Sequence, residues 1–181
     1  MKKLTVKEMC LAALMAALLC VTGPLSLPIG PVPISLATLV VYLTGYVLGW
    51  KLGSVSVLLY LILGAVGVPV FSNFQSGLGK LTGPTGGYLI GYLPLVIIVG
   101  IVASRNAKNF LACILAMVAG TAVLYTMGTA WLAFSTGMTA SAAIAAGVLP
   151  FLIGDAAKIL IAAFLGYALQ SRLRAAKLAV I

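Results

Sequence analysis

The sequence of 181 residues contains no histidine and only two acidic residues, and each shortage excludes a class of function. Histidine is the commonest metal ligand and general base, so its absence argues against metal and acid–base catalysis. The three cysteines, Cys10, Cys20 and Cys113, lie in apolar stretches with no spacing typical of a metal site or disulfide framework. The sequence therefore predicts no enzyme activity, no metal and no cofactor.

Charge is also scarce, at 7% of residues against 63% hydrophobic residues. A soluble domain carries roughly 25% charged residues, so this chain has too little polar surface to coat a globule in water. Its solvent is predicted to be the lipid bilayer. The fold class is then all-α, a polytopic membrane protein, and no repeat or linker divides the single domain, 1–181.

Apolar runs predict six transmembrane helices, since a spanning helix needs about 20 mainly apolar residues. They are expected at 6–21, 34–48, 54–68, 87–103, 109–127 and 148–170. The connector over 128–147 is rich in small residues and is expected to hold a short helix at the membrane interface.

The net charge of +9 is distributed along the chain in a way that indicates membrane topology. Six spans place both termini on one side and collect most of the basic residues there: Lys2, Lys3, Lys7, Lys51, Arg105, Lys108, Arg172, Arg174 and Lys177. The positive-inside rule makes that side cytoplasmic. The charge therefore predicts a multi-pass protein of the cell membrane with cytoplasmic N- and C-termini, and it does not indicate nucleic-acid binding.

Asp155 and Lys158 are the main candidates for ligand contact, because both are charged and fall inside the last predicted span. A spacing of three places them on one helical face, at expected depths of about 10 Å and 15 Å from the external end of the helix. A charge at such depth costs at least about 2.5–3.5 kcal/mol and is usually functional. The alternative is a structural ion pair that holds helices together.

A polar, glycine-rich loop is predicted on the external side over 71–86, within a segment over 67–88 that holds candidate ligand contacts. Asn73 offers a donor pair and an acceptor, while Phe71 and Tyr88 offer apolar faces to a ligand. The segment is not a nucleotide-binding loop, because Leu81 follows Gly79-Lys80 where the Walker motif needs Ser or Thr. The alternative is a purely structural loop. Further aromatic residues are interpreted as interface markers or pocket walls: Trp50, Tyr60, Tyr125, Trp131 and Tyr167.

Small residues at a spacing of four mark the first span. Ala12 pairs with Ala16, and Ala13 pairs with Ala17. Such faces let helices approach closely in lipid, where the hydrophobic effect does not drive association. The stripe is predicted to contact another membrane subunit, and the alternative is packing within this chain.

Three motifs together resemble the BioY family, the biotin-binding S components of energy-coupling factor (ECF) transporters. They are VPVF at 68–71, GPTGGYLIGY at 83–92 and GDAAK at 154–158, and the resemblance covers nearly the whole chain. It implies biotin bound from outside with high affinity, with contacts from Asn73, Asp155 and Lys158. It also implies that the alanine stripe contacts the ECF transmembrane subunit and that two partner ATPases hydrolyse ATP.

The chemistry of biotin fits these residues. Asp155 can accept from the ureido N–H groups, and Lys158 can donate to an oxygen. The carboxylate of biotin needs a donor near the mouth of the site, and Lys80 is a candidate.

Three other functions remain open to test. An S component for another vitamin shares the architecture but not the combined motifs. A proton-coupled carrier could use Asp155 as a proton relay, although no inverted repeat of the kind common in such carriers is seen. A membrane enzyme is disfavoured by the lack of catalytic groups.

Overall fold

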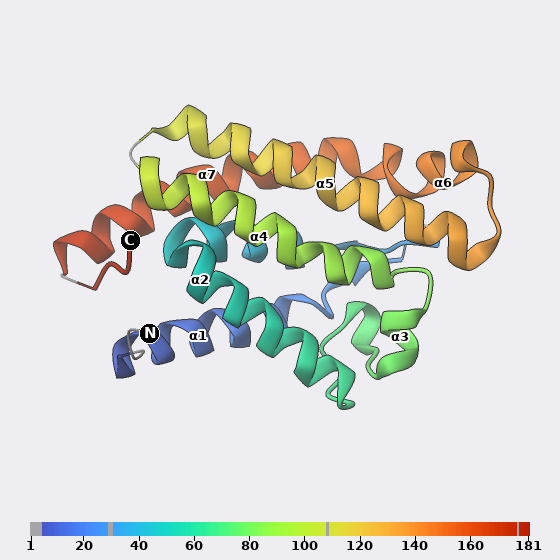
Figure 1. Cartoon of the computed structure of the whole chain (residues 1–181), viewed down its shortest axis with the longest axis horizontal. Coiled ribbons are helices and arrows are strands. Elements are labelled where there is room, and N and C mark those ends of the chain that lie inside the picture. Colours follow the sequence, from blue (N-terminus) through green and yellow to red (C-terminus); the bar gives the residue numbers. More distant parts are fainter. Residues whose placement is uncertain (1–4, 29–30, 108, 177) are drawn as a thin grey trace.

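The computed structural model describes residues 5–28, 31–107, 109–176 and 178–181, and it is built almost entirely of helices (Figure 1). The prediction of a mainly helical membrane protein is confirmed at this level. In chain order the elements are α1 (Val6–Thr22), β1 (Ser26–Leu27), β2 (Ile34–Ser35), α2 (Ala37–Ala65), η1 (Ser72–Phe74), α3 (Leu78–Thr82), α4 (Gly86–Asn106), α5 (Phe110–Thr136), α6 (Ala140–Gly147), η2 (Leu149–Phe151) and α7 (Leu152–Ala175).

Several helix ends are determined by local sequence. Thr5 and Glu8 form a capping box at the start of α1, which satisfies two backbone donors at once. Asn109 and Thr139 accept from backbone N–H groups at the starts of α5 and α6. Gly137 ends α5 at φ 71°, a left-handed conformation that glycine adopts without a steric penalty. These residues fix the starts of α1, α5 and α6 and the end of α5.

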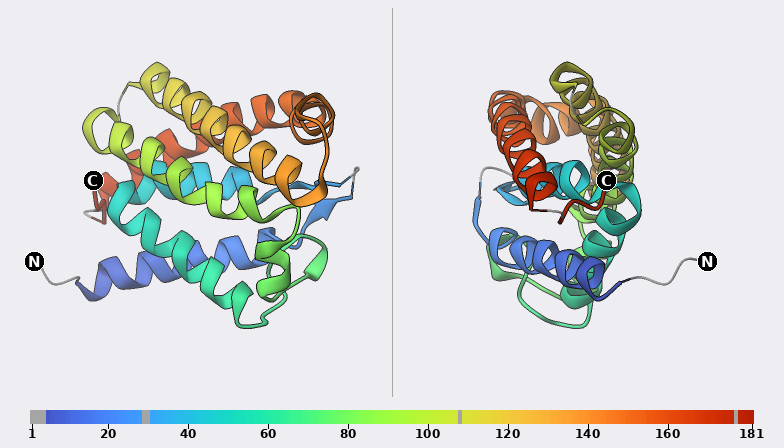
Figure 2. Two further views of the ribbon diagram at one scale, coloured as in Figure 1. Left: turned by 45° about the vertical axis from the view of Figure 1, so that its right-hand side comes forward. Right: turned by 90° about the vertical axis from the view of Figure 1, so that its left-hand side faces the viewer.

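Helix α2 folds back on itself at Gly49, where φ is 72°. A Cβ atom on Gly53 would lie 3.7 Å from the Cα atom of Gly45, whereas eight residues of straight helix would separate them by about 12 Å. Figure 2 shows the two arms running in opposite directions. The predicted spans at 34–48 and 54–68 are therefore two arms of one element, 37–48 and 50–65, joined with almost no loop.

Helix α4 packs between α2 and α5, while α1 lies against α2, and α7 contacts α2 and α5 (Figures 1 and 2). Tyr42, Leu95 and Met117, from α2, α4 and α5, are fully buried at the centre. Many large apolar side chains point outward instead, including Phe134 at 85% exposure and Ile153 at 87%. An apolar exterior of this extent is stable only against lipid.

Four helical stretches of the described chain are long and apolar enough to cross a membrane: Ala37–Ala65, Gly86–Asn106, Phe110–Thr136 and Ala140–Ala175. The last of these runs over α6, η2 and α7. Helix α1, with 17 residues, is not among them. The structure thus supports a multi-pass protein but does not by itself give six crossings.

The boundaries of the fifth predicted span were wrong, because α5 continues to Thr136 through Gly128. A Cβ atom on Gly128 would lie 2.4 Å from the ring of Tyr88, so this glycine permits close packing and does not end the helix. The short helix expected in the connector is α6, which is confined to Ala140–Gly147.

The start of α1, the bend at Gly49 and the ends of α4 and α7 lie at one end of the molecule (Figure 2, left). The described basic residues predicted to share a side belong to these segments: Lys7, Lys51, Arg105, Arg172 and Arg174. Lys2, Lys3, Lys108 and Lys177 lie outside the described residues. Helix α3, which carries Lys80, lies at the opposite end with β1 and β2. Which end faces the cytoplasm stays a prediction.

Candidate ligand-binding site

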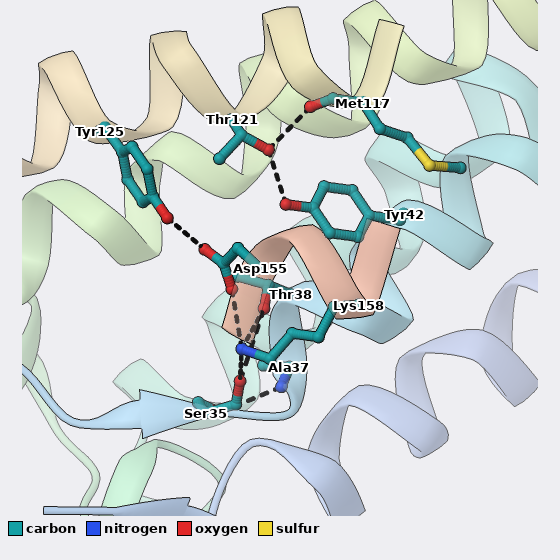
Figure 3. Close-up of polar contacts among 9 residues, drawn as sticks. All are labelled: Ser35, Ala37, Thr38, Tyr42, Met117, Thr121, Tyr125, Asp155 and Lys158. Atoms are coloured by element: carbon teal, nitrogen blue, oxygen red, sulfur yellow. Dashed lines mark hydrogen bonds and ion pairs between the residues drawn. The ribbon is translucent and has the colours of Figure 1, made fainter. Parts of the chain in front are cut away.

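Asp155 and Lys158 form a buried ion pair, with Lys158 Nζ 2.9 Å from Asp155 Oδ1 (Figure 3). The ammonium group also donates to the carbonyl oxygen of Ser35 at 2.7 Å and to Thr38 Oγ1 at 3.1 Å. A lysine has three N–H donors, and here all three are used. Lys158 therefore joins α7 to β2 and to the beginning of α2.

The second carboxylate oxygen of Asp155 accepts from the hydroxyl of Tyr125 on α5 at 2.6 Å. Nearby, Thr121 donates to the carbonyl of Met117, so Tyr42 must be the donor in its 2.6 Å contact with Thr121 (Figure 3). Both members of the ion pair are thus satisfied by the protein itself, as the structural alternative requires. Removal of either partner would leave an uncompensated buried charge.

The depth predicted for Asp155 was too great, because α7 begins at Leu152 and places this carboxylate in its first turn. Residues 149–151, which the prediction included in the span, form the separate η2. An anion at a helix N-terminus is stabilised by the helix dipole, typically by about 0.3–1 kcal/mol.

Two small internal cavities lie beside the ion pair. The ion-pair cavity, of about 50 Å³, is walled by Thr38, Leu124, Tyr125, Phe151, Asp155 and Lys158. The hydroxyl cavity, of about 30 Å³, is walled by Gly23, Tyr60, Ser72, Thr85 and Leu89. The two share the walls Val32, Pro33, Ser35, Tyr88 and Tyr92, so they are adjoining parts of one internal space.

Tyr88 is the one loop-region candidate that lines both cavities. Its hydroxyl donates to the carbonyl of Gly147 at 2.9 Å, which fixes the ring between α4 and the end of α6. Phe71 lines neither cavity. It is fully buried against Gly64 and makes an edge-on contact with Tyr60 at 5.6 Å between ring centres.

Asn73 is exposed and lines a different, outer groove of about 670 Å³ between the β1–β2 hairpin and η1. Its backbone lies at φ 59°, and its side-chain oxygen accepts from Ser26 at 3.0 Å. Its neighbour Ser72 reaches the hydroxyl cavity instead. The structure therefore does not bring Asn73 together with Asp155 and Lys158 in this form, and its role stays a prediction.

The alanine stripe on α1 divides into two faces. Ala12 and Ala16 are buried, and Ser56 on α2 donates to the carbonyl of Ala12 at 2.9 Å. Ala13 and Ala17 are exposed. The first pair packs within the chain, and the second pair is free to meet another surface.

Four wall residues carry polar groups that sequence reasoning missed: Ser35, Thr38, Thr85 and Tyr92. Tyr92 follows Tyr88 by one helical turn, which was a usable signal. Tyr60 and Tyr125, interpreted as interface markers or pocket walls, line the cavities. Among the described residues, no group of three or more His, Cys, Asp or Glu side chains could hold a metal ion.

The apolar exterior and the long helices define a multi-pass membrane protein, and it contains an internal space with charged and aromatic walls. Residues 1–175 match the BioY family, and the chain belongs to that family.

Relatives of known type agree with this assignment. The chain is 41% identical to the probable biotin transporter BioY of Pyrococcus horikoshii over 164 residues, which are 91% of this chain and 96% of that protein. It is 37% identical to the biotin transporter BioY of Thermotoga maritima over the same shares of the two chains. A crystal structure of the S component for biotin from an ECF-type ABC transporter superposes with a TM-score of 0.86 at 27% identity, covering 93% of this chain and 95% of that chain.

Proposed function

We propose that this protein captures biotin on its external face and delivers it for import as the S component of an ECF transporter. The observation that carries the proposal is the buried Asp155–Lys158 pair at the wall of an internal cavity, found in a member of the BioY family. A buried pair that only joined helices would not need to border an open space between four helices.

The ureido ring of biotin carries two N–H donors and one carbonyl acceptor. Asp155 accepts from an N–H group, and Lys158 donates to the carbonyl by giving up one of its protein partners, Ser35 or Thr38. Tyr88, Tyr92 and Phe151 supply apolar walls for the fused ring and chain. An analogue without ureido groups cannot replace the protein hydrogen bond that Lys158 gives up when the site is occupied, which costs about 1–3 kcal/mol for each group left unpaired.

The internal space must widen to admit the ligand. Cavities of about 50 and 30 Å³ hold a few water molecules, whereas small-molecule pockets are typically about 300–1,000 Å³. The β1–β2 hairpin and the segment around η1 cover the space, since Val32, Pro33 and Ser72 belong to its walls. Their outward movement opens the site. In the ligand-bound state we assign Asn73 a ligand contact from the loop side. We assign Phe71 the role of supporting Tyr60.

The topology proposed is six membrane crossings, made by α1, the two arms of α2, α4, α5 and α7, with both termini cytoplasmic. The shared end of the described basic residues supports this orientation. Ala13 and Ala17 face outward on α1 and are assigned to the ECF transmembrane subunit. ATP hydrolysis is assigned to two partner ATPase subunits.

Equilibrium binding of biotin to the purified chain in detergent tests this function. We expect a dissociation constant in the nanomolar range for the folded protein and no saturable binding of thiamine or riboflavin. Absence of biotin binding by folded protein would refute the proposal, and saturable binding of another vitamin would reassign the substrate.

A further inference from the structure

The hydroxyl cavity is bordered by three residues whose hydroxyl groups have no hydrogen-bond partner among the described residues: Tyr60, Thr85 and Tyr92. The three residues are 1%, 6% and 6% exposed. Of the three, only Thr85 Oγ1 is a fully buried atom. Buried polar groups in proteins are almost always hydrogen-bonded, so the unpartnered Oγ1 atom of Thr85 is unusual. Tyr60 and Tyr92 line the same cavity and leave their hydroxyl groups unused. The hydroxyl groups come from two helices, α2 and α4, and converge on the same small space.

Thr85 occupies the N-cap position of α4 without acting as a cap. A threonine there normally accepts a hydrogen bond from a backbone N–H group of the first turn, but the side chain of Thr85 makes no such bond. Its Oγ1 atom is buried without a partner at the cavity wall. The 21-residue α4 therefore presents its N-terminus, with its partial positive charge, beside an unused hydroxyl group.

We propose that Tyr60, Thr85 and Tyr92 form the subsite for the carboxylate of the ligand. This inference rests on the proposed function, since it assigns the second polar end of the same molecule. Three hydroxyl groups can donate to carboxylate oxygens, and the end of α4 favours an anion. No acidic side chain borders this cavity among the described residues.

The arrangement of the two cavities matches the arrangement of polar groups in biotin. The ureido ring and the carboxylate of biotin are separated by an apolar chain. Here the ion pair and the hydroxyl groups are separated by shared walls that are mostly apolar, including Val32, Pro33 and the ring of Tyr88. An extended ligand that spans the two adjoining cavities meets both polar sets.

Lys80 is the competing candidate for the carboxylate. It lies on α3, and it is not among the described residues that line either cavity. Partial burial lowers the pKa of its ammonium group. The two assignments make different predictions for variants.

The test measures binding of biotin and of biotin amide, whose tail is neutral, to the full chain in detergent. Tyr92→Phe and Thr85→Val should each weaken biotin binding about 10-fold and amide binding less than about 3-fold. Thr85→Ser, which keeps the hydroxyl group, should retain the preference for biotin. Thr126→Val serves as a control, because this threonine is exposed on α5 and bonds only within its helix.

Thermal unfolding without ligand gives a second readout. Since the hydroxyl groups have no partner in the part of the chain that the structure describes, Tyr92→Phe and Thr85→Val should leave the unfolding temperature of the free protein unchanged or raise it. Three results would overturn the subsite: equal weakening of both ligands, no weakening of either, or loss of the biotin preference only in Lys80→Ala. Failure of the proposed function is distinct, because the unmodified folded protein would then bind neither ligand.

Discussion

The ion-pair cavity and the hydroxyl cavity share half of their walls but differ in how their polar atoms are bonded. In the first, every donor of Lys158 and both carboxylate oxygens of Asp155 have protein partners. In the second, the hydroxyl groups of Tyr60, Thr85 and Tyr92 have none among the described residues. A ligand at the ion pair must exchange hydrogen bonds, whereas a ligand at the hydroxyl groups gains them.

This difference separates two contributions to binding. Exchange at a satisfied pair yields little net free energy for a matching ligand but penalises a ligand that leaves a charge unpaired, so the ion-pair cavity sets specificity. Bonds formed to unsatisfied hydroxyl groups add free energy outright, so the hydroxyl cavity sets affinity. The variants described next test whether specificity and affinity are divided in this way, beginning with the largest expected effect.

Replacing one member of the ion pair should have the largest effect. Asp155→Asn leaves Lys158 buried without its counter-charge, so we expect a stability loss of about 3–5 kcal/mol and a fall in biotin affinity of at least about 100-fold. The double variant Asp155→Leu, Lys158→Met should regain much of the unfolding temperature without regaining binding. Retained biotin binding in the double variant would make the pair structural only.

Tyr125→Phe removes the hydrogen bond to Asp155 Oδ2. A bond to a charged group contributes about 1.5–3 kcal/mol, so stability should fall by that amount and biotin affinity by about 10-fold. Tyr42→Phe is the matched control, because Tyr42 loses a buried bond to Thr121 but lines neither cavity. Calorimetry should show lower stability in both variants and lower affinity only in the first.

Gly128→Ala should displace the ring of Tyr88, which walls both cavities. Overpacking of this kind costs about 1–3 kcal/mol, and we expect a lower unfolding temperature together with a few-fold weaker biotin binding. Gly79→Ala is the control, since a Cβ atom there meets nothing within 4 Å. Equal behaviour of the two variants would contradict the packing role of Gly128.

Asn73 should show the smallest effect. Asn73→Gly accepts the left-handed backbone at φ 59° and removes only the side chain, so a lost ligand contact should weaken biotin binding about 3- to 10-fold. Asn73→Ala adds backbone strain of about 1–2 kcal/mol and should lower the unfolding temperature further. Unchanged affinity in Asn73→Gly would restrict the side chain to its bond with Ser26.

Charge and hydropathy made part of the site predictable. Asp155 and Lys158 were found because a charge inside an apolar run is costly. Tyr88 was found from an aromatic residue in a glycine-rich loop. By contrast, Thr85 and Tyr92 are common residue types at ordinary positions, and only the three-dimensional structure shows that their hydroxyl groups lack partners. Phe71 and Asn73 are only two residues apart in the sequence, yet the structure places them in different surroundings.

The helices, like the site, could be predicted only in part from the sequence. Apolar runs gave their approximate positions, but the role of each glycine depends on its neighbours. Gly49 reverses the chain with a positive φ, whereas Gly128 remains helical because a ring packs over it. Sequence alone treats both as breakers. Likewise, a spacing of four selects Ala12 and Ala13 equally, and only the packing of α2 against α1 buries one and exposes the other.

The unequal lengths of α1 and α5 have a consequence for the surrounding lipid. Helix α1 has 17 residues and α5 has 27, which correspond to lengths of about 26 Å and 40 Å. The hydrocarbon core of a bilayer is about 30 Å thick. In the proposed topology, where both helices cross the bilayer, hydrophobic mismatch acts in opposite directions on the two sides of the molecule. Lipid must then thin beside α1, while α5 must tilt, so the proposed orientation depends on acyl-chain length.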